Sequence, residues 1–147
     1  MQNLETMSEV VNELISIDRK TNILAVCDNG NSRSKLIARV LSRIGYENCR
    51  VLGINSPDYD MAAKISALET ADIVVCASDD VRSQLEFFIN QKQITRKLTI
   101  LSLGLSEKIH ARSHVSLVED EKLDDEIKAI LERHGFKILE AQLSVTN

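Results

Sequence analysis

The chain has 147 residues, of which 44% are hydrophobic and 27% charged, and its formal net charge is −4. This length suits one domain with a single core, spanning residues 1–147. The acidic balance gives no electrostatic basis for binding nucleic acid. No apolar run approaches the ~20 residues that span a bilayer, and the polar N-terminus lacks the apolar core of a signal peptide. We therefore expect a cytoplasmic protein that binds neither nucleic acid nor a membrane.

Residues 1–20 are predicted to form a helical extension ahead of the first strand. Apolar side chains recur at helical spacing between residues 4 and 18, which is typical of an amphipathic helix. They are Leu4, Met7, Val10, Val11, Leu14 and Ile15. We favour a role in covering one face or edge of a sheet, and binding of a partner is the alternative.

Beyond this extension, apolar strand patterns alternate with amphipathic helix patterns. The predicted strands are 22–27, 49–54, 72–77 and 98–103. The predicted helices are 33–44, a segment that starts at Pro57, a segment capped by Ser78 or Asp79 that ends near Gln91, and 121–134. The strand at 72–77 is almost continuously apolar, as in a parallel strand that is buried on both faces. The alternation predicts a three-layer α/β/α fold with a four-stranded, parallel, doubly wound sheet.

The first strand ends at Cys27, and Arg33 follows six positions later, where a helical pattern begins. Short polar or glycine residues between them can turn their backbone N–H groups inward, and such a loop at a helix N-terminus binds an oxyanion. The same field favours the thiolate, which is the nucleophilic form of cysteine. The predicted phosphate-binding residues besides Arg33 are Asp28, Asn29, Gly30, Asn31, Ser32 and Ser34. The alternative is that Cys27 is a packing residue at the end of a buried strand.

This C-x5-R-S pattern near the chain start resembles the phosphate loop of the low-molecular-weight protein tyrosine phosphatase superfamily. Two features depart from the common form of that loop: Asn29-Gly30 stands where relatives have Gly-Asn, and Ser32 replaces a second cysteine. The loop also looks like that of the branch that acts on the C-terminal domain of RNA polymerase. The resemblance implies an atypical member that works through a phosphocysteine intermediate without a cofactor or metal. Ser34 would then donate a hydrogen bond to the sulfur of Cys27.

A phosphatase also needs an acid that protonates the leaving oxygen. The resembled family carries an aspartate on a loop just before its last helix, and Asp120 matches it by order, although Glu121 replaces the proline that usually follows. Asp124, Glu119 and His110 are the other candidates. Alternatively, the acidic run around Asp120 is a charged first turn of the helix.

Two further residues are expected near the site. Tyr59 follows the second strand, where the resembled family often places an aromatic substrate wall, although it could equally be an exposed loop residue. Asp28 would repel phosphate if it pointed inward, so we expect it to face solvent or to pair with a cation such as Lys35.

The remaining cysteines and the histidines suggest neither disulfides nor a metal site. Cys49 and Cys76 lie at strand ends and are predicted to be packing residues, and no C-x2-C pair is present. The expected activity is a phosphoric monoester hydrolase that acts on a phosphorylated protein or a small phosphate ester, as a monomer or weak dimer. Two alternatives remain: a IIB-type phosphocysteine carrier of a sugar phosphotransferase system, and an inactive phosphate-binding module.

Overall fold

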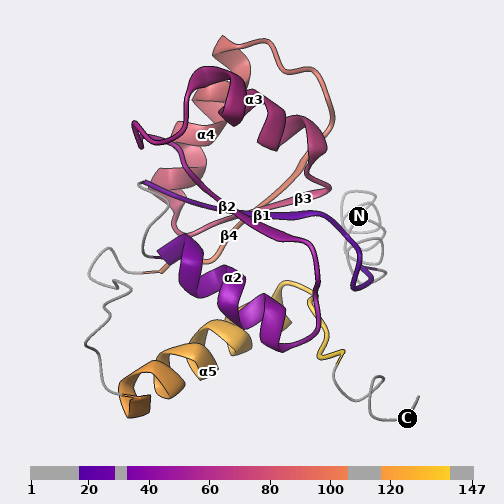
Figure 1. Cartoon of the computed structure of the whole chain (residues 1–147), viewed down its shortest axis with the longest axis vertical. Helices are drawn as coiled ribbons and strands as arrows, with labels where there is room; N and C mark the ends of the chain where they lie inside the picture. Colours follow the sequence, from indigo (N-terminus) through magenta and orange to yellow (C-terminus); the bar gives the residue numbers. More distant parts are fainter. Residues whose placement is uncertain (1–16, 29–32, 106–116, 140–147) are drawn as a thin grey trace, which may run out of the picture.

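The structure is a computed structural model that describes residues 17–28, 33–105 and 117–139. Four parallel strands form one sheet in the order β2-β1-β3-β4. They are β1 (Ile23–Cys27), β2 (Cys49–Gly53), β3 (Ile73–Cys76) and β4 (Thr99–Ser102). The described helices are α2 (Arg33–Arg43), α3 (Met61–Thr70), α4 (Asp79–Gln91) and α5 (Leu117–Arg133). Helices α2 and α5 cover one face of the sheet, and α3 and α4 cover the other (Figure 1). The predicted three-layer α/β/α fold is thus confirmed.

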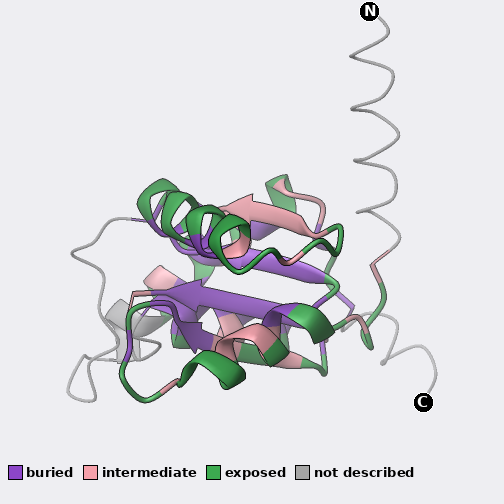
Figure 2. Ribbon diagram, turned by 90° about the horizontal axis from the view of Figure 1, so that it is seen from above, coloured by how far each residue is buried: buried purple, intermediate pink, exposed green. Residues whose placement is uncertain are grey.

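The central strands β1 and β3 are buried along their whole length, because each has a strand on both sides and a helical layer on both faces (Figure 2). Alternate side chains of β1 enter different cores. Ile23, Ala25 and Cys27 pack with residues of α2 and α5, whereas Leu24 and Val26 pack with residues of α3 and α4. The side chain of Cys27 therefore lies on the α2 face of the sheet.

Helix α2 follows β1 and packs with an apolar stripe formed by Leu36, Ile37, Val40 and Leu41. Its C-terminal end is closed by Gly45, whose φ of +116° favours glycine. A Cβ atom at this position would lie 2.5 Å from Cβ of Leu139, so the chain after α5 packs directly on the end of α2. The Leu139 N–H donates to the carbonyl of Ile44 at 2.7 Å, which fixes the same contact.

The predicted helix start at Pro57 is wrong, because this residue lies in a turn. The Tyr59 N–H donates to the Ser56 carbonyl at 3.3 Å, which makes Pro57 the second residue of that turn, a position that suits its fixed φ. Helix α3 begins at Met61 instead, and the Asp60 side chain caps it by accepting from the Ala63 N–H at 2.8 Å.

The N-terminal helical extension lies mostly outside the described residues. Ile17 and Asp18 are not helical, and the Asp18 side chain accepts from the Lys20 N–H at 2.8 Å in the turn that leads to β1. The prediction that this helix reaches residue 18 is therefore wrong at its end. Among the described helices, none is long and apolar enough to cross a membrane.

Candidate functional site

Cys27 is the last residue of β1, at the carboxyl edge of the sheet. The parallel strands β2 and β3 lie on opposite sides of β1. Cys27 therefore lies at the switch point in strand order, where doubly wound sheets bind ligands. Its side chain is buried, and its Sγ lies 3.0 Å from Oγ of Ser34, which is fully buried in the first turn of α2. A hydroxyl at this distance can donate to a thiolate. The predicted contact between Ser34 and the sulfur is present, but here the Cys27 thiol donates and the Ser34 hydroxyl accepts, so donation from Ser34 to a thiolate stays a prediction.

Arg33 is the first residue of α2, and only 4% of it is exposed. Its Nη1 donates to the carbonyl oxygen of Leu105 at 3.3 Å, and its Nη2 lies 3.6 Å from Oδ2 of Asp28. Leu105 is placed there because its own N–H donates to the Ala77 carbonyl, just beyond β3, at 2.7 Å. The guanidinium is therefore a buried cation that is held beside Asp28, the residue that follows the end of β1.

Asp28 pairs with a cation, as expected, but the cation is Arg33 and not Lys35. Lys35 is two residues farther along α2, which turns its side chain roughly 200° around the helix axis from Arg33. Lys35 is exposed to solvent. The Asp28 carboxylate thus occupies part of the space beside the guanidinium that an incoming oxyanion would use.

The four residues between Asp28 and Arg33 lie outside the described part of the chain. They are Asn29, Gly30, Asn31 and Ser32. Their predicted role, a cradle of backbone N–H groups, stays a prediction.

Asp120 lies inside a helix and not on a loop before it, so this part of the prediction is wrong. Helix α5 begins at Leu117, and acidic residues in a first turn favour such an early start by opposing the positive end of the helix dipole. The side chains of Glu119 and Asp120, and all of His110, lie outside the described residues. Helices α2 and α5 run in the same general direction (Figure 1), which places the first turn of α5 toward the end of the molecule that carries Cys27.

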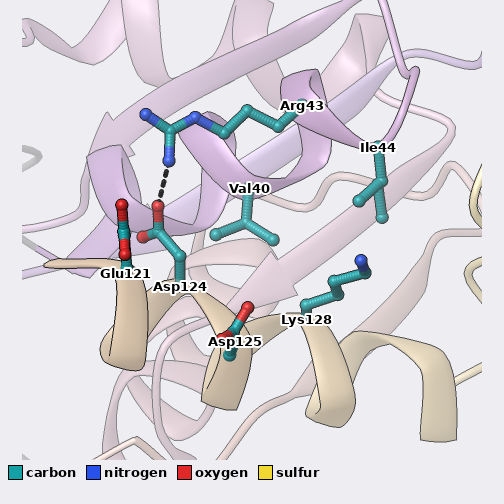
Figure 3. Close-up of a pocket in the computed structure, with 7 residues that line it drawn as sticks. All are labelled: Val40, Arg43, Ile44, Glu121, Asp124, Asp125 and Lys128. Atoms are coloured by element: carbon teal, nitrogen blue, oxygen red, sulfur yellow. Dashed lines mark hydrogen bonds and ion pairs between the residues drawn. The ribbon is translucent and has the colours of Figure 1, made fainter. Parts of the chain in front are cut away.

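Asp124, another candidate acid, instead joins α5 to α2. Its side chain is 9% exposed and forms ion pairs with Arg39, at 2.5 Å, and with Arg43. Figure 3 shows it pointing from α5 toward Arg43, beside a pocket of about 190 Å³. Arg39 and Arg43 lie roughly 9 and 15 Å beyond Arg33 along the helix axis. Asp124 therefore joins the two helices. Because its partners lie well beyond Arg33 along α2, its carboxylate is too far from Cys27 to protonate a leaving group there.

The loop after β2 adds a contact that was not predicted from the sequence. The Asn55 N–H donates to the Asp28 carbonyl at 2.9 Å, and its side-chain amide donates to Oδ1 of Asp28 at 3.2 Å and to Oε1 of Gln84 at 2.5 Å. Asn55 lies just after a strand at the carboxyl edge, which is a signal that could have identified it. Tyr59, in the same loop, is half-buried and packs against the α3/α4 core, so its role as a substrate wall stays a prediction.

The two other thiols lie in environments that suppress the thiolate. Burial raises the pKa of Cys49 to about 11 and that of Cys76 to about 12. Because the thiolate is the nucleophile and metal ligand, both thiols are inert at neutral pH, in agreement with packing roles. Among the described residues, no three Cys, His, Asp or Glu side chains are grouped as ligands of a metal ion would be.

Comparisons with family models, with curated proteins and with solved structures found no match to this chain.

Proposed function

We propose that the protein is a cysteine-dependent phosphatase that hydrolyses phosphotyrosine through a phosphocysteine at Cys27. The observation that carries the proposal is the 3.0 Å contact between Cys27 Sγ and Ser34 Oγ, together with the buried guanidinium of Arg33, which pairs with Asp28, the residue that follows Cys27. A buried cation attracts an anion, and a guanidinium matches two phosphate oxygens. A nucleophilic sulfur and a phosphate-binding cation at one point of the sheet edge are what such a reaction needs.

In the proposed reaction, the Cys27 thiolate attacks phosphorus and the bond from phosphorus to the ester oxygen breaks. Arg33 and the loop amides hold the phosphoryl oxygens, while Asp120 gives its proton to the leaving oxygen. Water then attacks the phosphocysteine and passes a proton to Asp120, which releases inorganic phosphate and the thiolate. Ser34 stabilises that thiolate by donating its hydroxyl hydrogen. The chemistry requires a reduced thiol, which agrees with our expectation of a cytoplasmic protein.

Hydrolysis of p-nitrophenyl phosphate, with and without vanadate, tests the proposal. We expect vanadate-sensitive turnover that Cys27→Ser abolishes and that Arg33→Lys lowers strongly, because a lysine cannot bind two oxygens as a planar fork. Cys49→Ser is the matched control and should leave kcat unchanged, because its thiol is protonated and lies at the start of β2. Turnover that survives Cys27→Ser would contradict the proposal.

The same assay separates the alternatives. Stable phosphorylation of Cys27 by a phosphocarrier protein, without turnover, would favour the carrier. Phosphate binding with neither turnover nor labelling would favour the inactive module.

The role of Asp120 requires a comparison of leaving groups. An acid contributes about 10²–10⁴-fold when the leaving oxygen is basic and little when it is not. Asp120→Asn should therefore lower kcat more for an alkyl phosphate than for p-nitrophenyl phosphate, and Asp124→Asn should show no such difference in the folded protein. An equal loss of kcat on both substrates would mean that Asp120 stabilises the helix and does not transfer a proton.

A further inference from the structure

A hollow of about 440 Å³ lies between the loop after β2 and one face of α4. Gln84, Phe87 and Phe88 line it from α4 and share a face because they are three and four residues apart. Phe88 is buried, but 67% of Phe87 is exposed, which is the highest exposure among the large apolar side chains that the structure describes. The exposed Phe87 ring and the buried Phe88 ring give the hollow an apolar wall that an incoming apolar group could cover.

Hydrogen bonds join two residues that line the hollow to the end of β1, where Cys27 lies. Its lining residues Ile54 and Asn55 donate their N–H groups to the carbonyls of Cys27 and Asp28, both at 2.9 Å. The Asn55 amide also joins Asp28 to Gln84. An extended peptide advances about 3.3–3.6 Å per residue, so side chains within a few residues of a phosphotyrosine held at Cys27 can reach the hollow.

The chemistry of the lining selects the occupant. The polar residues around it are Asn55, Ser83, Gln84 and Gln91, and no lining residue is charged among those that the structure describes. A charged side chain would lose water there without gaining a partner, whereas an apolar one would bury its surface against the two phenylalanines. An aromatic side chain gains further from edge contacts with their rings.

We propose that this hollow is a subsite for a bulky apolar side chain of a phosphorylated peptide, so that the protein acts on proteins in preference to small phosphate esters. The inference rests on the proposed phosphatase function. Phe87 is the specificity-determining residue of the subsite. The Asn55 amide fixes the position of the subsite relative to Asp28.

Paired phosphotyrosine peptides test the subsite. Each pair differs only by Phe or Ala at one position from three before to three after the phosphotyrosine. We expect a preference of about tenfold in kcat/KM for Phe at one or two positions, which is the size of effect that filling an apolar pocket gives. Phe87→Ala should remove the preference and leave turnover of p-nitrophenyl phosphate unchanged. Met61→Ala, which changes an exposed apolar residue at the start of α3, is the matched control and should keep it.

The outcomes separate this inference from the function on which it rests. Turnover of p-nitrophenyl phosphate without any peptide preference, or a preference that survives Phe87→Ala, overturns the subsite alone. If the wild-type protein is a dimer and Phe87→Ala dissociates it, the hollow is a contact between two copies of the chain. That result would overturn the subsite as well. Absence of turnover by the wild-type protein overturns the phosphatase and the subsite together.

Discussion

Arg33 and Asp28 form an ion pair at the point where the proposed substrate must bind. The guanidinium is buried, whereas 44% of the Asp28 side chain is exposed, and their closest atoms are 3.6 Å apart. At this distance the pair is an electrostatic contact and not a short hydrogen bond. A phosphate that binds Arg33 must therefore displace or tolerate a neighbouring carboxylate. If the protein binds phosphate as proposed, Asp28 is therefore expected to weaken that binding.

Asp28→Asn should strengthen binding of inorganic phosphate and vanadate. The variant removes a negative charge beside Arg33 while keeping a side chain that can bond to Asn55, and a partly exposed pair contributes about 1 kcal/mol, or about fivefold in affinity. Inhibition constants against p-nitrophenyl phosphate measure the effect. Asp58→Asn, in the exposed turn after β2, is the control and should change nothing. Weaker inhibition of Asp28→Asn would mean that Asp28 orients Arg33 instead of competing with phosphate.

Helices α2 and α5 are held together by charge as well as by apolar packing. Ile127 and Leu131 of α5 belong to the same core as Leu36 and Val40 of α2. One turn before Ile127, Asp124 binds two arginines of α2 while almost fully buried. The carboxylate is buried, but the side chains of Arg39 and Arg43 are 33% and 61% exposed, so water still solvates both cations. The contact nevertheless ties α5 to the helix that carries Arg33 and Ser34.

Asp124→Asn should lower the free energy of unfolding by about 1 kcal/mol, because two partly exposed arginines lose their common anion. Urea unfolding measures this, with Asp125→Asn as the control, since Asp125 is the adjacent but exposed carboxylate of the same helix. Turnover per folded molecule should stay unchanged. A stable Asp124→Asn variant with low kcat would return Asp124 to the list of candidate acids.

At the scale of the whole molecule, the order of the strands brings the site together. Apolar runs identify β1 and β3 from the sequence, because central strands bury both faces, and they place Cys27 at the sheet edge. Other features cannot be predicted because one local pattern fits two structures. Pro57 is favourable both in a turn and at a helix start, and an acidic run is typical both of a loop and of a first helical turn. The pairing of Asp28 with Asn55 joins residues that are distant in sequence, and no local pattern reports it.

Burial of the core thiols should make the protein less stable in alkali. The native state keeps the Cys76 proton up to a pKa of about 12, whereas the unfolded chain loses it near 9. The unfolded state binds fewer protons between these values, so stability is complete below about pH 8.5 and falls as pH rises toward 12. This thiol should account for about 1 kcal/mol of lost stability at pH 10.

Urea unfolding at pH 7 and pH 10 checks the prediction. Cys76→Ala should lose less stability between the two pH values than the wild-type protein does. Val74→Ala, which truncates a buried residue of the same strand, should lose as much as the wild type. Equal losses in all three proteins would show that Cys76 titrates alike in the folded and unfolded states.

The central claim is that Cys27 forms a covalent bond to phosphorus, and intact-mass analysis after rapid acid quenching of a reaction with p-nitrophenyl phosphate tests it most directly. We expect a fraction of the protein to carry the added mass of one phosphoryl group, located on the peptide that contains Cys27 and absent from Cys27→Ser. Release of inorganic phosphate with no phosphorylated enzyme, or with the phosphoryl group on another residue, would contradict the account.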